Sequence, residues 1–116
     1  MPHGQQSQSA APRLLAFFER VAQRDPALLG ALRREARFGF APGRWCFGLP
    51  DLHAFLQRRD AVFRSMDYTS FRTLLFDSPV NRAVRTRGAE IVIADNRGKV
   101  DRSRYALRWD VGRPVQ

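Results

Sequence analysis

The stretch Ser78–Trp109, SPVNRAVRTRGAEIVIADNRGKVDRSRYALRW, carries the clearest fold signals in the chain. Its first part predicts a short helix from Ser78 to Arg87. Ser78 is a favourable N-cap, and Pro79 suits the first helical turn because its missing N–H is not needed there. Gly88 supplies the left-handed stop that commonly ends a helix. The apolar stripe of this helix consists of Val80, Ala83 and Val84.

A two-stranded β-hairpin is predicted to follow Gly88. The run Ile91–Ile93 is rich in β-branched residues, and Asp95–Gly98, with the sequence DNRG, has the composition of a turn. Beyond the turn, Tyr105, Leu107 and Trp109 alternate with other residues, so one face of the second strand is apolar. The sequence therefore predicts an α+β fold that ends in a helix and a hairpin.

Two helical segments are predicted near the start of the chain. Residues 1–11 read as a disordered leader, and residues 12–116 as a single small α+β domain. A helical hairpin begins at Pro12, and Asp25 with Pro26 ends its first helix and starts its second. Residues 38–49, FGFAPGRWCFGL, lack helical periodicity and are interpreted as a connector, either a small hairpin or a structured loop with its turn at Pro42-Gly43.

Two further helices are predicted between this connector and Ser78. Pro50-Asp51 opens the first of them, and a break is predicted at Arg59-Asp60. Asp67 caps the second, which ends near Asp77. The residues expected in the core are Phe17, Phe18, Leu32, Phe55, Phe71, Leu74, Ile91, Ile93 and Leu107.

The chain is strongly basic, with a formal net charge of +9. Its basic residues are nineteen arginines and the single Lys99, a bias that is typical of codon usage in a GC-rich bacterial genome. Arginine placement is more informative, because residues 82–108 hold eight basic groups against three acidic ones. Such a field attracts phosphate polyanions and, less specifically, acidic proteins.

The order helix, helix, helix, hairpin from residue 50 onward resembles a winged helix-turn-helix domain. The resemblance implies that the helix Ser78–Arg87 is a recognition helix and that the hairpin is a wing. The residues that would contact nucleic acid are then Asn81, Arg82 and Arg85 on the helix and Arg97, Lys99, Arg102 and Arg104 on the wing. The corresponding function is a small basic nucleic-acid-binding protein, such as a DNA-binding regulator.

Two alternatives remain open from the sequence. The first is a non-enzymatic protein-interaction module, which would use an aromatic patch or the edge of the C-terminal hairpin. In that interpretation the second strand, ending at Trp109, is a sheet edge able to accept a partner strand. In the second alternative the helix simply packs on the sheet, and its arginines only solvate the outer face.

Enzymatic motifs are absent from the sequence. Glu90, Asp95 and Asp101 with Lys99 superficially suggest a metal-dependent nuclease, but no spacing fixes a ligand set. The lone Cys46 is expected to be buried and inert, and His53, expected to be exposed, gives only a speculative dyad with it. We therefore predict a non-enzyme with no cofactor and no metal.

The first residues of the chain are polar and lack the apolar segment of a secretory signal. No run of 18 apolar residues occurs anywhere in the sequence, so no membrane span is expected. The sequence thus predicts a cytoplasmic protein whose partner is nucleic acid or another protein.

Overall fold

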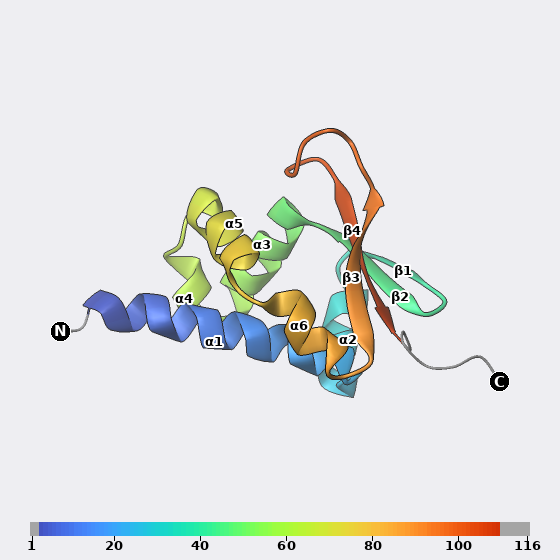
Figure 1. The fold of residues 1–116 in the computed structure, drawn as a ribbon, viewed down its shortest axis with the longest axis horizontal. Coiled ribbons are helices and arrows are strands. Elements are labelled where there is room, and N and C mark those ends of the chain that lie inside the picture. Colours follow the sequence, from blue (N-terminus) through green and yellow to red (C-terminus); the bar gives the residue numbers. More distant parts are fainter. Residues whose placement is uncertain (1–2, 110–116) are drawn as a thin grey trace.

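The computed structural model describes residues 3–109, and their side chains from Ala10 onward. These residues form helices and one antiparallel sheet (Figure 1). The helices are α1 His3–Ala22, α2 Pro26–Arg33, α3 Leu49–Arg59, α4 Ala61–Arg64, α5 Tyr68–Asp77 and α6 Val80–Arg85. The strands are β1 Gly39–Ala41, β2 Arg44–Gly48, β3 Ala89–Asp95 and β4 Arg104–Trp109. The predicted α+β class is confirmed.

Aspartate side chains cap three of the helices. Asp25 accepts from the backbone N–H of Leu28 at 2.9 Å, and Asp67 from that of Ser70 at 2.8 Å. Both caps confirm the sequence prediction, and each carboxylate has its pKa lowered, first of all by this backbone hydrogen bond. Asp60 ends α3 and caps α4, which confirms the predicted break.

The predicted capping role of Ser78 is wrong. Its hydroxyl donates to the carbonyl oxygen of Leu74 at 2.7 Å, so it closes the last turn of α5. Serine competes for nearby carbonyl groups in this way, and α6 begins after Pro79 without a side-chain cap. The predicted stop at Gly88 is confirmed by its positive φ of 83°.

The helix α1 starts at His3, whereas the apolar pattern predicts a start at Pro12. Pro12 therefore lies inside α1. The predicted disorder of residues 1–11 stays a prediction. Residues 1–2 of the predicted leader and residues 110–116 of the predicted domain lie outside the described residues.

The sheet has four antiparallel strands in the order β1-β2-β4-β3. Residues 38–49, interpreted as a connector that is either a small hairpin or a loop, form the β1-β2 hairpin, whose turn contains Gly43 at a φ of 77°. Trp45 pairs with Leu107 and Phe47 with Tyr105, so both strands place their large apolar side chains on one face. β4 is paired on both sides, so the prediction that the second hairpin strand is a sheet edge is wrong; the edges are β1 and β3.

The connection between β3 and β4 is longer than the predicted DNRG turn. It spans residues 96–103 and follows a bulge in β3 between Ile93 and Asp95. The buried Ser103 hydroxyl accepts from the N–H of Arg97 at 3.1 Å and donates to the carbonyl of Lys99 at 2.8 Å. These two bonds give the loop a defined shape.

The helices lie on one side of the sheet and enclose an aromatic core (Figure 1). Trp45 is fully buried at its centre, with the ring of Phe47 stacked at 4.4 Å and that of Phe38 edge-on at 5.3 Å. The correctly predicted buried residues are Phe17, Phe18, Leu32, Phe55, Phe71 and Leu107. Leu74 and Ile91 are only partly buried.

Three burial predictions are wrong. Ile93 is 57% exposed, because it lies beside the bulge at the end of an edge strand. His53 is buried, with its ring stacked on Phe71 at 4.9 Å and its Nε2 atom 2.8 Å from the carbonyl oxygen of Met66, to which it donates. Cys46 is only half-buried, since its register places it on the face opposite the core.

Candidate functional site

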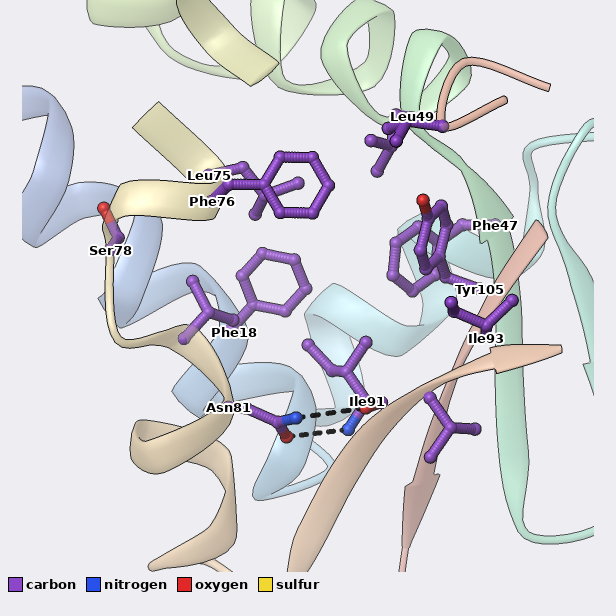
Figure 2. Close-up of a pocket in the computed structure, with 13 residues that line it drawn as sticks. Phe18, Phe47, Leu49, Leu75, Phe76, Ser78, Asn81, Ile91, Ile93 and Tyr105 are labelled. Carbon is purple, nitrogen blue, oxygen red and sulfur yellow. Dashed lines mark hydrogen bonds between the residues drawn. The ribbon is translucent and has the colours of Figure 1, made fainter. Parts of the chain in front are cut away.

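An apolar groove opens between β3 and the junction of α5 with α6 (Figure 2). Its volume is about 400 Å³, which is within the range of ligand-binding pockets. We call it the β3 groove; it is lined by Phe18, Phe47, Leu49, Leu75, Phe76, Ser78, Val80, Asn81, Ile91, Val92, Ile93, Val100 and Tyr105. Helix α1, the sheet, both flanking helices and the 96–103 loop thus all contribute to one surface.

The exposed large hydrophobic residues of the described chain converge on this groove. They are Phe76 at 56% exposure, Ile93 at 57% and Val100 at 40%. A single exposed hydrophobic residue is ordinary on a protein surface, but a contiguous group marks a binding site. Figure 2 shows Phe76 and Ile93 on opposite walls, with Phe18 below Phe76 on the same wall.

Asn81 fastens α6 to the edge strand at the lower end of the groove. Its Nδ2 donates to the carbonyl oxygen of Ile91 at 3.1 Å, and its Oδ1 accepts from the N–H of Ile91 at 3.0 Å (Figure 2). The amide therefore takes the place of one residue of a neighbouring strand. Along an edge strand, every second residue points its backbone N–H and carbonyl away from the sheet. The backbone groups of Ile93 therefore point outward like those of Ile91, and no described side chain hydrogen-bonds to them.

The loop 96–103 is held against α5 by Asp101. This carboxylate accepts from the Tyr68 hydroxyl at 2.6 Å and from Arg72 Nη1 at 3.0 Å. The two bonds lower the pKa of Asp101, with the Tyr68 contribution the larger. Burial, and then the bond to Asp101, raise the pKa of Tyr68. This contact fixes the loop that carries Val100, which closes one end of the groove.

We expect the contact between the loop and α5 to weaken in acid. Because the folded-state pKa of Asp101 lies below its unfolded value, the stabilisation is complete above the ordinary aspartate pKa of about 4 and is lost as the pH falls through the folded value. Amide chemical shifts of residues 96–103 should therefore change with pH below about 4. Asp101→Ala should produce the same changes at neutral pH, and loop shifts insensitive to both would contradict this role.

Tyr105 adds a polar atom to the groove. Its ring is almost fully buried against Phe47, and burial raises the pKa of its hydroxyl. Within residues 10–109, no side chain or backbone group hydrogen-bonds to this hydroxyl. The β3 groove is thus an apolar surface with one hydroxyl available to a bound molecule.

The three candidate residues on the predicted recognition helix have different environments. The side-chain amide of Asn81 is hydrogen-bonded to the backbone of Ile91, and Arg85 forms an ion pair with Glu90 at 3.2 Å. Arg82 is exposed. The helix itself, α6, has six residues and packs against α1 and β3.

Of the four candidate residues on the predicted wing, Arg97, Lys99 and Arg102 lie in the loop 96–103 between β3 and β4, and Arg104 is the first residue of β4. Arg97 pairs with Asp95 at 2.7 Å, and Arg104 donates to the carbonyl oxygen of Arg37 at 3.3 Å. Lys99 and Arg102 are exposed in the loop. The structure therefore separates the two predicted groups along β3. The winged-helix resemblance is not confirmed, since β1 and β2 complete the sheet ahead of the predicted helices.

The acidic residues singled out in the sequence each contact basic groups. Glu90 contacts Arg85, Asp95 contacts Arg97, and Asp101 contacts Arg72. Across the described part of the chain, no three or more His, Cys, Asp or Glu residues are grouped so that they could hold a metal ion. In the same residues, no helix combines the length and apolar character needed to cross a bilayer.

Sequence reasoning missed the β3 groove. One signal for it was present: Ile91, Val92 and Ile93 are consecutive apolar residues, so both faces of this strand are apolar and a single core cannot cover them. Phe76 gave no comparable signal, because its exposure depends on where α5 ends.

Comparisons of the chain with protein-family models, curated proteins and solved structures found no match. Its function has to be argued from its own residues.

Proposed function

We propose that this protein is an interaction module that binds an apolar segment of a partner protein in the β3 groove. The observation that carries the proposal is the convergence of Phe76, Ile93 and Val100 on one groove beside an edge strand. A cytoplasmic location and the absence of enzymatic activity belong to the same proposal.

An extended peptide suits the groove better than a compact small molecule does. Small-molecule sites bury most of their ligand, whereas Phe76 and Ile93 remain more than half exposed on the two walls of this groove. The groove also follows the exposed edge of β3, along which an extended chain can lie.

Asn81 limits how such a peptide can bind. Because the Asn81 amide already hydrogen-bonds to the backbone of Ile91, a partner strand can pair with β3 only from Ile93 toward the end of the strand. Main-chain pairing is therefore short, and apolar side chains inserted between Phe76 and Ile93 supply most of the affinity. The Tyr105 hydroxyl provides one hydrogen bond that fixes the position of the peptide.

A peptide-display selection tests this proposal. Random twelve-residue peptides selected on the natural protein should be enriched in apolar residues at alternate positions. Binding of the enriched peptides should weaken at least tenfold on Ile93→Glu, because a charge is placed on the groove wall. Thr73→Glu, which adds the same charge at an exposed site on α5 outside the groove, should leave binding unchanged.

Two results would overturn the proposal. One is a selection that yields no enrichment over a blank surface. The other is a set of peptides that bind Ile93→Glu and the natural protein equally, which would place their site elsewhere on the molecule.

A further inference from the structure

The second face of the sheet is not covered by the helices. The strand register places eleven residues on it, none of which is part of the main hydrophobic cluster: Gly39, Ala41, Arg44, Cys46, Gly48, Glu90, Val92, Asp95, Arg104, Ala106 and Arg108. Of these, Gly48 and Ala106 are buried beneath their neighbours. We call this surface the open face. In Figure 1 the helices lie on the other side of the sheet.

Two arginines of the open face are direct cross-strand neighbours. Arg44 on β2 is in register with Arg108 on β4, and both side chains are exposed. Like charges directly opposite each other in an antiparallel pair destabilise a sheet. Within the described residues, neither guanidinium forms an ion pair or hydrogen bond. Glu90 is in register with Arg108 on the other side, but its carboxylate pairs with Arg85, so within the described residues Arg44 and Arg108 are two adjacent positive charges with no ion-pair partner of their own.

A third arginine lies flat on the same face. A Cβ added at Gly48 would lie 3.9 Å from Arg104 Nη1, and one added at Gly39 would lie 3.8 Å from Arg104 Nη2. The guanidinium of Arg104 therefore reaches from β4 across β2 toward β1, over two glycines. One of its nitrogens donates to the Arg37 carbonyl, which leaves its other donors for a ligand.

The carboxylates near this face are already engaged by other arginines. Glu90 pairs with Arg85, and Asp95 pairs with Arg97. Asp51, whose carboxylate lies near Gly48, pairs with Arg37 at 3.4 Å. These ion pairs leave Arg44, Arg104 and Arg108 as the positive charges that the face presents to solvent.

We propose that the open face binds the phosphates of a nucleic-acid backbone, with Arg44 and Arg108 at one anchor and Arg104 at the other. Arg104 and Arg108 are four positions apart on β4, about 13 Å, so the two anchors contact different phosphates. The guanidinium group of arginine binds phosphate through two parallel hydrogen bonds. The small residues between the two anchors let the nucleic-acid backbone approach the sheet. This inference is independent of the β3 groove.

The chemistry of the face favours nucleic acid over an acidic protein. The open face has no aromatic side chain and no large apolar anchor, so it offers a peptide little buried area. Phosphate neutralisation alone gives a basic surface appreciable affinity for nucleic acid. Without aromatic rings for stacking or side chains that reach a groove, binding should be independent of base sequence.

Fluorescence anisotropy with a labelled random-sequence DNA of 20 nucleotides, single-stranded or duplex, tests the inference. The double variant Arg44→Gln/Arg108→Gln should bind at least tenfold more weakly at about 50 mM salt. The slope of log affinity against log salt should flatten by about two, because two phosphates are no longer neutralised by arginine. The matched control is Arg34→Gln/Arg82→Gln, which removes the same charge from two exposed arginines on the helical side of the molecule and should change affinity less than threefold.

Three outcomes would overturn the inference. The natural protein fails to bind either DNA at low salt; the two double variants lose affinity equally, which indicates diffuse charge; or polyglutamate competes as well as unlabelled DNA. Thermal melts distinguish a misfolded variant from a folded one that no longer binds phosphate. Removing the opposed pair relieves repulsion, so the melting temperature of Arg44→Gln/Arg108→Gln should not fall.

Discussion

Replacing Phe71 with alanine is expected to lower the free energy of unfolding by about 3–5 kcal/mol. Phe71 is fully buried on α5, with the His53 ring stacked on it at 4.9 Å and the Phe63 ring edge-on at 6.3 Å. Truncation removes these ring contacts and leaves a cavity between α3, α4 and α5. Small domains have total stabilities of about 5–15 kcal/mol, so this single change removes a large share.

Urea unfolding followed by circular dichroism measures this cost. Phe76→Ala is the matched control, because it makes the same chemical change on the same helix at a side chain that is 56% exposed. We expect the control to cost less than about 1 kcal/mol, in keeping with surface substitutions. Equal losses at both positions would show that α5 does not pack on the core through Phe71.

The features that the sequence predicted correctly are local ones. Asp25 and Asp67 cap helices through hydrogen bonds to residues three positions away, so the signal and the structure lie within one turn. Gly88 ends a helix for a reason confined to its own φ angle. Such effects need no knowledge of the rest of the chain.

Apart from the Ser78 cap, the main errors concern contacts between distant parts of the chain. The pairing of β2 with β4 joins residues some 60 positions apart, for example Trp45 with Leu107, and no local pattern encodes it. The burial of His53 depends on Phe71 and Met66, which come from later elements. Ile93 fits a core pattern by composition, yet the bulge and the edge position leave it exposed.

The candidate sites show the same division. Arginine density drew attention to residues 82–108, but density alone does not reveal which arginines lack a partner. Arg85 and Arg97 are paired with acids, whereas Arg44, far from that window in sequence, is placed beside Arg108 by the register of β2 and β4. The strand register, rather than the charge count, separates the arginines that maintain the fold from those available to a ligand.

Replacing Asn81 with alanine should lower the free energy of unfolding by about 2–3 kcal/mol, although the side chain is only partly buried. The change removes both hydrogen bonds to Ile91 and leaves an N–H and a carbonyl oxygen unpaired between α6 and β3. It also uncovers a second outward-facing position on the edge of the sheet, next to Ile93. Exposed edges of this kind pair with other chains.

Two measurements separate these consequences of Asn81→Ala. Hydrogen exchange should accelerate at the Ile91 amide, and light scattering should report association of the variant at high concentration. Arg82→Ala is the control, since it removes an exposed neighbour on α6 and should leave both unchanged. Asn81→Asp keeps the acceptor for the Ile91 N–H but loses the donor to its carbonyl, so it should fall between alanine and the natural residue. An Ile91 amide that exchanges at the same rate in all of these variants would show that Asn81 does not hold α6 to the edge strand.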